Sequence, residues 1–147
     1  MKTFEFTLSS TNDNLHNFEL ELLRILEDLK LEPSKINELS LAVIEAVGNA
    51  IRHGNKFDPN KFVKVKLSII KDHINILVED QGQGFDITKV DDPTKPENLL
   101  KTSGRGIYIM RNIMHNFEVI CKKDRTIVKM SYYFNYDKGQ ESSKIVP

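Results

Sequence analysis

Hydrophobic and polar positions follow two different periods along the chain, and each change of period marks a new predicted element. Residues 4–8 alternate between apolar and polar, as expected of a strand with one buried face. Across residues 15–31 the apolar positions instead recur every three or four residues, as on one face of a helix. Ser34 is a suitable cap for a second helix, which we expect to run to about His53 before Gly54 ends it.

The second half of the chain returns to alternation, with one further helical stretch. Its predicted elements are a hairpin at 63–69 and 74–78 around a turn at 71–72, a helix at 106–115, and a second hairpin at 117–121 and 126–134. Residues 86–103 contain two prolines and few apolar residues, and we interpret them as a long mobile loop. This order predicts an α+β fold, a two-layer α/β sandwich, with one domain at 1–134 and a flexible tail at 135–147.

Composition narrows the class of protein without identifying it. The chain has 147 residues, 39% of them hydrophobic, with 21 Lys plus Arg against 21 Asp plus Glu. A formal net charge of zero argues against a nucleic-acid partner, and no apolar run is long enough to span a membrane. The chain shows no signal peptide, and its one cysteine, Cys121, cannot form an internal disulfide, so we expect a cytoplasmic protein. Cys121 lies in an alternating apolar run and is predicted to be a small core residue.

Three polar residues interrupt the second predicted helix at a regular spacing. Glu45, Asn49 and His53 lie four residues apart, which places them on one stripe opposite the apolar face. Glu45 could act as a general base, and the side-chain oxygen of Asn49 could bind Mg²⁺. A polar stripe is also what the solvated side of an ordinary helix looks like, so this pattern alone leaves both interpretations open.

A carboxylate and two glycines follow the first hairpin. Asp80 continues the buried phase of its strand, where a charged group needs a partner. Gly82 and Gly84 follow at alternate positions and would let the backbone approach a flat ligand, whose exocyclic amine Asp80 could bind. The simpler alternative is a glycine-rich turn in which Asp80 caps a backbone amide.

The last predicted helix begins with Gly104-Arg105-Gly106, which is an unfavourable start. Glycine is a poor helix former, and a cation near a helix N-terminus opposes the helix dipole. An anion bound there would explain both, because free amides at a helix N-terminus bind phosphate and Arg105 could bind it in a bidentate way. A flexible loop end with a solvated Arg105 remains the alternative.

Taken together and in this order, the three segments resemble the N, G1 and G2 boxes of the GHKL ATPases. Glu45, Asn49-Ala50 and His53-Gly54-Asn55 match the first box, Asp80-x-Gly82-x-Gly84 the second, and Gly104-Arg105-Gly106-Ile107 the third. Within that superfamily the chain looks most like the small anti-sigma-factor serine kinases of bacterial partner-switching systems. Sensor histidine kinases usually lack an acid where Glu45 stands and carry a further helical hairpin, and gyrase- and chaperone-type members carry further domains.

The resemblance implies a Bergerat ATP-binding fold with ATP and Mg²⁺ as cofactors. Asn49 would match the Mg²⁺ ligand, Asp80 the adenine-binding carboxylate and Glu45 the catalytic carboxylate. Arg105 would contact phosphate, and His53 matches a recurrent position of unassigned role. The glycines that would flank an ATP lid at 86–103 are Gly82, Gly84, Gly104 and Gly106.

The resemblance further implies a protein-serine/threonine kinase that is also an anti-sigma factor. Its partners would be a small anti-anti-sigma antagonist and a sigma factor or similar regulator, with no direct nucleic-acid or membrane contact. A homodimer follows from analogy only. The main alternative is an ATP-gated binding switch without kinase activity, and a slow water-directed ATPase is a third.

Overall fold

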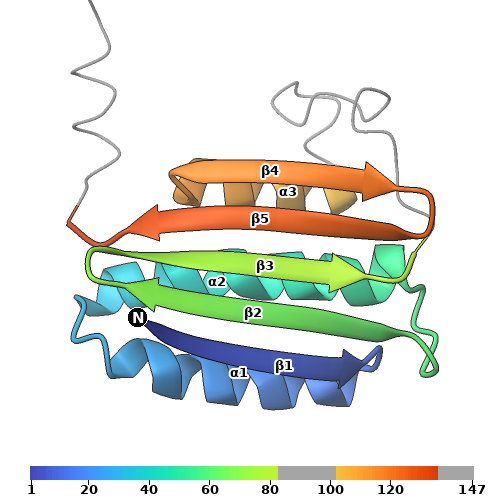
Figure 1. Ribbon diagram of the computed structural model, residues 1–147, viewed down its shortest axis with the longest axis horizontal. Helices are drawn as coiled ribbons and strands as arrows, with labels where there is room; N and C mark the ends of the chain where they lie inside the picture. The colour runs from blue at the N-terminus through green and yellow to red at the C-terminus, as the bar shows by residue number, and fades with distance from the viewer. Residues whose placement is uncertain (83–101, 136–147) are drawn as a thin grey trace, which may run out of the picture.

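The computed structural model describes residues 1–82 and 102–135. Helices form one layer against one face of a five-stranded antiparallel sheet with strand order β1-β2-β3-β5-β4 (Figure 1). The elements are β1 (Lys2–Ser9), α1 (Asn12–Glu27), α2 (Pro33–Asn49), the π-helix η1 (Ala50–Gly54), β2 (Phe62–Ile70), β3 (His73–Asp80), α3 (Thr102–Ile113), β4 (Asn116–Lys122) and β5 (Arg125–Tyr133). The predicted class, layers and element order are confirmed.

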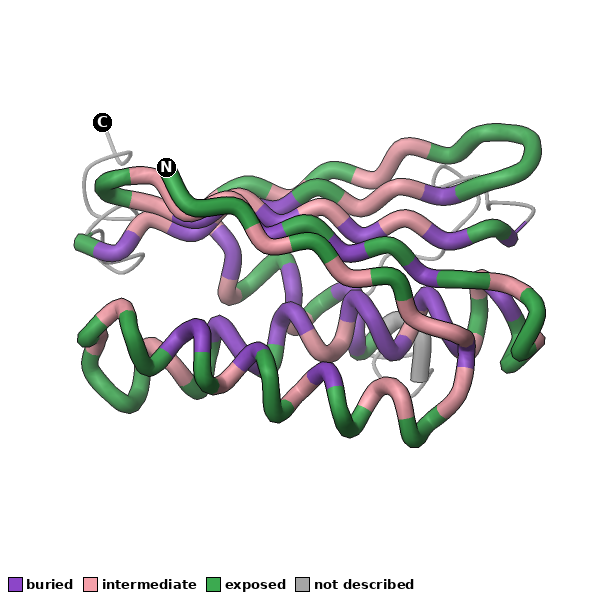
Figure 2. The backbone as a smooth tube through the Cα atoms, turned by 60° about the horizontal axis from the view of Figure 1, so that its bottom comes forward, coloured by how far each residue is buried: buried purple, intermediate pink, exposed green. Residues whose placement is uncertain are grey.

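The hydrophobic core lies between the two layers, and both layers contribute buried residues to it (Figure 2). On β2, Val63, Val65 and Leu67 are at most 1% exposed, whereas the intervening Lys64 and Lys66 are exposed on the face away from the helices. The two lysines lie opposite acidic residues, Lys64 beside Glu79 and Lys66 beside Glu5. Period-two alternation in the sequence therefore identified the buried face of the sheet correctly.

Two helix boundaries differ from the prediction for local reasons. α2 begins at Pro33, one residue before the predicted cap Ser34, because proline has no N–H to leave unpaired in a first helical turn. α1 ends at Glu27, short of Leu31, and Lys30 takes the left-handed conformation with a φ of 56°. The N-terminus of α1 is capped by Thr11, whose hydroxyl accepts a hydrogen bond from the Asn14 backbone N–H at 3.3 Å.

Cys121 was predicted to be a core residue, and this prediction is wrong. Its side chain is exposed. Cys121 has the inward phase of its strand, but β4 is an edge strand and Cys121 is its next-to-last residue, beside the β4–β5 turn. Alternation reports which way a side chain points and does not report whether a second layer covers that part of the sheet.

Several predictions concern residues outside the described ranges. Most of the predicted loop at 86–103 and nearly all of the predicted tail at 135–147 fall in the segments 83–101 and 136–147, which the structure does not describe. In the described part of the chain, no helix combines the length and apolar character needed to cross a membrane.

Candidate functional site

Glu45 and Asn49 lie together on α2, beneath the start of α3. A Cβ atom on Gly106 would lie 2.8 Å from Asn49 Nδ2 and 3.1 Å from Glu45 Oε2. Only a glycine therefore lets the α3 backbone pack this closely against the two polar side chains. The structure thus brings three of the predicted site residues into one contact between two helices.

The side-chain oxygen of Asn49 has an unusual environment. Among residues 1–82 and 102–135, Asn49 Oδ1 is buried and accepts no hydrogen bond. A buried acceptor without a partner costs roughly 1–3 kcal/mol, so such an atom in a folded protein calls for an explanation. A hard cation such as Mg²⁺ binds amide oxygens and often takes only one or two ligands from the protein, which fits this atom.

His53 lies in a π-helical turn that directly follows Asn49. The helix widens after Asn49 into the π-helix η1, in which the Asn55 N–H donates to the Ala50 carbonyl at 2.8 Å. A π turn takes one residue more than an α turn, and His53 within this turn is exposed. Its assignment to a nucleotide site stays a prediction.

Asp80 is the last residue of β3, and Gly54 and Gly82 pack closely against it. We call these two glycines and the Asp80 carboxylate the cradle. Its side chain is 6% exposed, and its Oδ1 accepts a hydrogen bond from the Gly82 N–H at 2.8 Å. A Cβ on Gly54 would overlap this carboxylate, lying 2.8 Å from Oδ1 and closer still to Oδ2. A Cβ on Gly82 would lie 3.0 Å from the same Oδ1 and would overlap the Gly54 carbonyl. Both glycines are therefore required by space around Asp80.

Burial and hydrogen bonding have opposite effects on the pKa of Asp80. Loss of solvent raises the pKa of Asp80, while backbone hydrogen bonds from Gly82 and Thr126 oppose the rise. The negative charge of Glu79 raises the pKa of Asp80 further, and the positive charge of Lys61 lowers it. The net effect is a raised pKa. A carboxylate in this setting gains from any ligand that donates a hydrogen bond to it.

The third predicted segment lies inside α3 and not before it. α3 begins at Thr102, so Gly104, Arg105 and Gly106 belong to its first turns, and the predicted start at Gly106 was four residues late. Arg105 is exposed next to the buried Gly106. Gly84 lies outside the described residues, so its predicted role is untested.

Two residues of the site were not assigned roles from the sequence. Gly54 was interpreted as a helix stop. In the structure, its lack of a side chain is what leaves space for the Asp80 carboxylate. Asn55 was quoted only as part of a motif, yet it is 1% exposed and hydrogen-bonded to the residue that follows Asp80. The sequence signal for both was their place directly after a polar helix stripe, in a segment expected to be an ordinary turn.

The chain belongs to the histidine kinase-like ATPase family, whose model matches residues 8–132. It is 34% identical over 125 residues to an anti-sigma F factor of Clostridium perfringens, covering 82% of this chain and 86% of that protein. It is 32% identical over 116 residues to the serine-protein kinase RsbW of Bacillus licheniformis, covering 75% of this chain and 72% of that protein.

A solved structure supports the same fold. The RsbU and RsbW domains of a Mycobacterium tuberculosis protein align with 90% of this chain, and with 32% of that one, at a TM-score of 0.67 and 16% sequence identity. The resemblance to GHKL ATPases that the three motifs indicated is therefore confirmed at the level of the family and of its anti-sigma and serine-kinase members.

Proposed function

We propose that this protein is an ATP-dependent protein-serine/threonine kinase that also acts as an anti-sigma factor. The observation that carries the proposal is the placement of an acid, Glu45, beside a buried amide oxygen, Asn49, under the helix start at Gly106. A carboxylate beside a site for metal and phosphate is what transfer of a phosphoryl group to a hydroxyl requires. The names of the curated relatives support the same activity.

In this proposal the two ends of the site bind the two ends of ATP. Asp80 accepts a hydrogen bond from the exocyclic amine of adenine, and Gly54 and Gly82 leave room for the Asp80 carboxylate. The Asn49 side-chain oxygen would hold Mg²⁺, and the metal would supply positive charge near the phosphates. Arg105 and the backbone of the glycine segments, including Gly84 and Gly104, would contact phosphate, and His53 lies next to Gly54 at the rim.

The transfer step assigns one role to Glu45. The hydroxyl oxygen of a serine or threonine on the substrate protein attacks the γ-phosphorus, and the bond from that phosphorus to the β–γ bridging oxygen breaks, leaving ADP. Glu45 takes the hydroxyl proton. Arg105 balances the charge on the transferring group.

The partners follow from the same proposal. The phosphorylated substrate is a small antagonist protein of the anti-anti-sigma class, and the second partner is a sigma factor or similar regulator that the protein sequesters. A homodimer and a cytoplasmic location are part of the proposal, by analogy with the anti-sigma and serine-kinase relatives.

An ATP-gated binding switch without kinase activity is the second candidate. Such a switch needs the cradle around Asp80 and the oxygen of Asn49 but has no use for a base. Glu45 Oε2 lies against the same glycine as Asn49, which favours the kinase. A water-directed ATPase would use the same residues with water as acceptor.

Calorimetric titration with Mg²⁺ and ATP, followed by transfer from γ-labelled ATP, separates these functions. A kinase should bind ATP saturably and place label on a serine or threonine of a purified antagonist protein. Saturable binding with no label on the antagonist would favour the switch, and label released only as phosphate would favour the ATPase. Absence of ATP binding would contradict all three.

Gly54 offers a direct test of the cradle. We expect Gly54→Ala to weaken ATP binding at least about tenfold and to destabilise the fold by about 1–3 kcal/mol, because the new methyl group overlaps the Asp80 carboxylate. Calorimetry and thermal unfolding measure the two effects.

Gly48→Ala is the matched control, six residues earlier in the same helical segment. The three atoms nearest to a Cβ there all belong to the end of the flexible Arg52 side chain, the first of them at 2.9 Å. Replacing glycine inside a helix should stabilise the protein by about 0.5–1 kcal/mol and leave ATP binding unchanged. Equal ATP affinity in the two variants would contradict the cradle.

A further inference from the structure

One buried asparagine joins the end of β3 to three other parts of the chain. Asn55 Nδ2 donates to the Ser10 hydroxyl at 2.9 Å, and Asn55 Oδ1 accepts from the Gln81 backbone N–H at 2.7 Å. The Asn55 backbone N–H closes the π turn on Ala50 at 2.8 Å, and its carbonyl accepts from the Asp58 N–H at 3.0 Å. Asn55 therefore links the β1–α1 junction, η1, the loop before β2 and the segment after β3.

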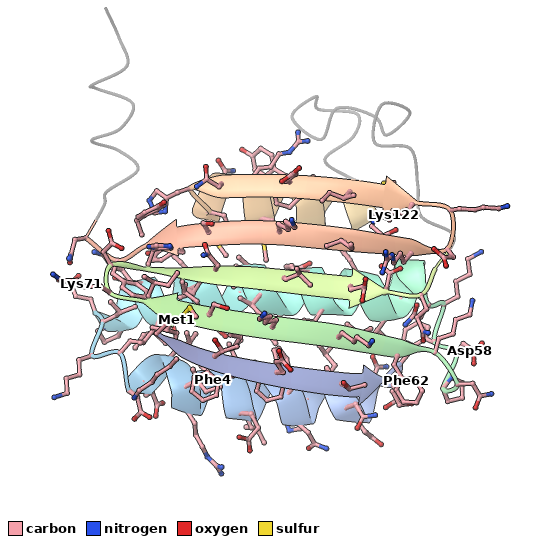
Figure 3. All side chains as sticks on the ribbon, in the orientation of Figure 1. Met1, Phe4, Asp58, Phe62, Lys71 and Lys122 are labelled. Carbon is pink, nitrogen blue, oxygen red and sulfur yellow. The ribbon has the colours of Figure 1, made fainter. Side chains whose placement is uncertain are left out.

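The partners of Asn55 are themselves fixed. Ser10 is fully buried, and its hydroxyl donates to the Lys61 carbonyl at 2.6 Å. Gln81 Oε1 accepts from the Phe62 N–H at 2.6 Å. Asp58 and Phe62 lie at the end of the sheet where β2 begins and β3 ends, away from Lys71 (Figure 3). The network is thus a closed set of short bonds at one end of the molecule.

This network holds the cradle from two sides. Asn55 is bonded covalently to Gly54, whose Cα faces the Asp80 carboxylate. Its side-chain oxygen also holds the backbone N–H of Gln81, the residue between Asp80 and Gly82. A shift of either segment by a few tenths of an ångström would change the space that the glycines leave around Asp80.

We propose that Asn55 is a positioning residue of the nucleotide pocket, which holds Gly54 and the Asp80–Gly82 segment so that the carboxylate faces the amine of an adenine base. The inference rests on the proposed function. It predicts an effect on the choice of base, because adenine presents an amine donor at its 6-position and guanine presents a carbonyl acceptor. A residue needed only for stability would leave that choice unchanged.

The protein contains a matched asparagine–serine pair outside the site. Ser131 Oγ donates to Asn75 Oδ1 at 2.7 Å between β5 and β3, on the face of the sheet away from the helices. Asn75→Ala therefore removes a comparable side-chain hydrogen bond without touching the cradle.

The experiment measures the affinities for ATP, GTP and inorganic tripolyphosphate by calorimetry, at a temperature where circular dichroism shows each protein folded. We expect Asn55→Ala to weaken ATP binding about tenfold, equivalent to about 1.4 kcal/mol, and GTP binding less. The ratio of ATP affinity to GTP affinity should therefore decrease, while the affinity for tripolyphosphate stays at the wild-type value. Asn75→Ala should keep the wild-type preference.

Two results would overturn the inference: an unchanged ATP-to-GTP preference in Asn55→Ala, or the same contraction in Asn75→Ala. If Asn55→Ala does not fold, Ser10→Ala takes its place, because it removes one bond of Asn55 and leaves the Gln81 bond intact. A contraction of about threefold is then expected, equivalent to about 0.65 kcal/mol, and an unchanged preference overturns the inference. Failure of the wild type to bind ATP would instead remove the proposed function, and this inference with it.

Discussion

Replacing Glu45 by alanine should lower phosphoryl transfer by roughly 10²-fold or more and leave ATP affinity nearly unchanged. A general base contributes about 10²–10⁴-fold to a rate, and Glu45 is not assigned any contact that binds the nucleotide. Transfer is measured at saturating ATP with a purified antagonist protein, and affinity by calorimetry. Glu45→Gln, which keeps the shape against Gly106, should show the same loss of rate.

The control for this prediction is Glu38→Gln. Glu38 lies two turns earlier on the same helix and is exposed, so the variant loses the same charge without changing the site. Its rate should match the wild type. If Glu45→Ala loses binding and turnover in equal measure, Glu45 holds the nucleotide and is not a base.

Replacing Asp80 by asparagine should weaken ATP binding by about 10- to 100-fold while the unliganded protein unfolds at the same or a higher temperature. A hydrogen bond to a charged group is worth about 1.5–3 kcal/mol, which sets the loss of affinity. The gain in stability follows because burial disfavours the charged form of Asp80, as its raised pKa shows. Asparagine keeps the shape and can still accept from the Gly82 N–H.

Asp124→Asn removes the same charge at an exposed position in the β4–β5 turn and serves as the control. It should change neither affinity nor melting temperature by a measurable amount. Wild-type ATP affinity in Asp80→Asn would contradict adenine recognition by Asp80. A large fall in melting temperature would contradict the account of its charge.

The pH dependence of the wild type should report on the same group. Because the folded-state pKa of Asp80 lies above that of the unfolded chain, the folded state takes up its proton first as the pH falls. In that window Asp80 adds stability to the unliganded protein, while ATP affinity falls because the protonated oxygen no longer accepts a hydrogen bond. Asp80→Asn should lack both changes as the pH falls from neutral toward the ordinary pKa of an aspartate, which unfolding and calorimetry at several pH values can show.

Periodicity in the sequence predicted the parts of the site that lie on regular elements. Four-residue spacing placed Glu45 and Asn49 on one side of α2, and two-residue alternation placed Asp80 on the buried face of β3. Both inferences use the geometry of one element at a time. They were reliable because α2 and β3 are regular up to those residues.

The parts that were not predicted depend on contacts between elements or on a change of helical geometry. The π turn of η1 leaves no mark in the hydrophobic pattern, which predicted a single helix to about His53. The role of Gly54 depends on a carboxylate 26 residues away, and the exposure of Cys121 depends on where the helix layer ends. The spacing of residues along the chain does not reveal contacts between elements or the edge of the helix layer.

The π turn also has a consequence for how the sequence of this protein can vary in length. Deleting one residue between Ala50 and Gly54 would shorten the five-residue step of the Asn55–Ala50 hydrogen bond to the four-residue step of an α-helix. The same deletion would rotate Gly54 away from Asp80 and Asn55 away from Gln81. The loop from Lys56 to Lys61 is held in the same way, because the Asp58 N–H donates to the Asn55 carbonyl and the Lys61 carbonyl accepts from the Ser10 hydroxyl. We expect homologues that share the pocket to preserve the number of residues from Asn49 to Asn55.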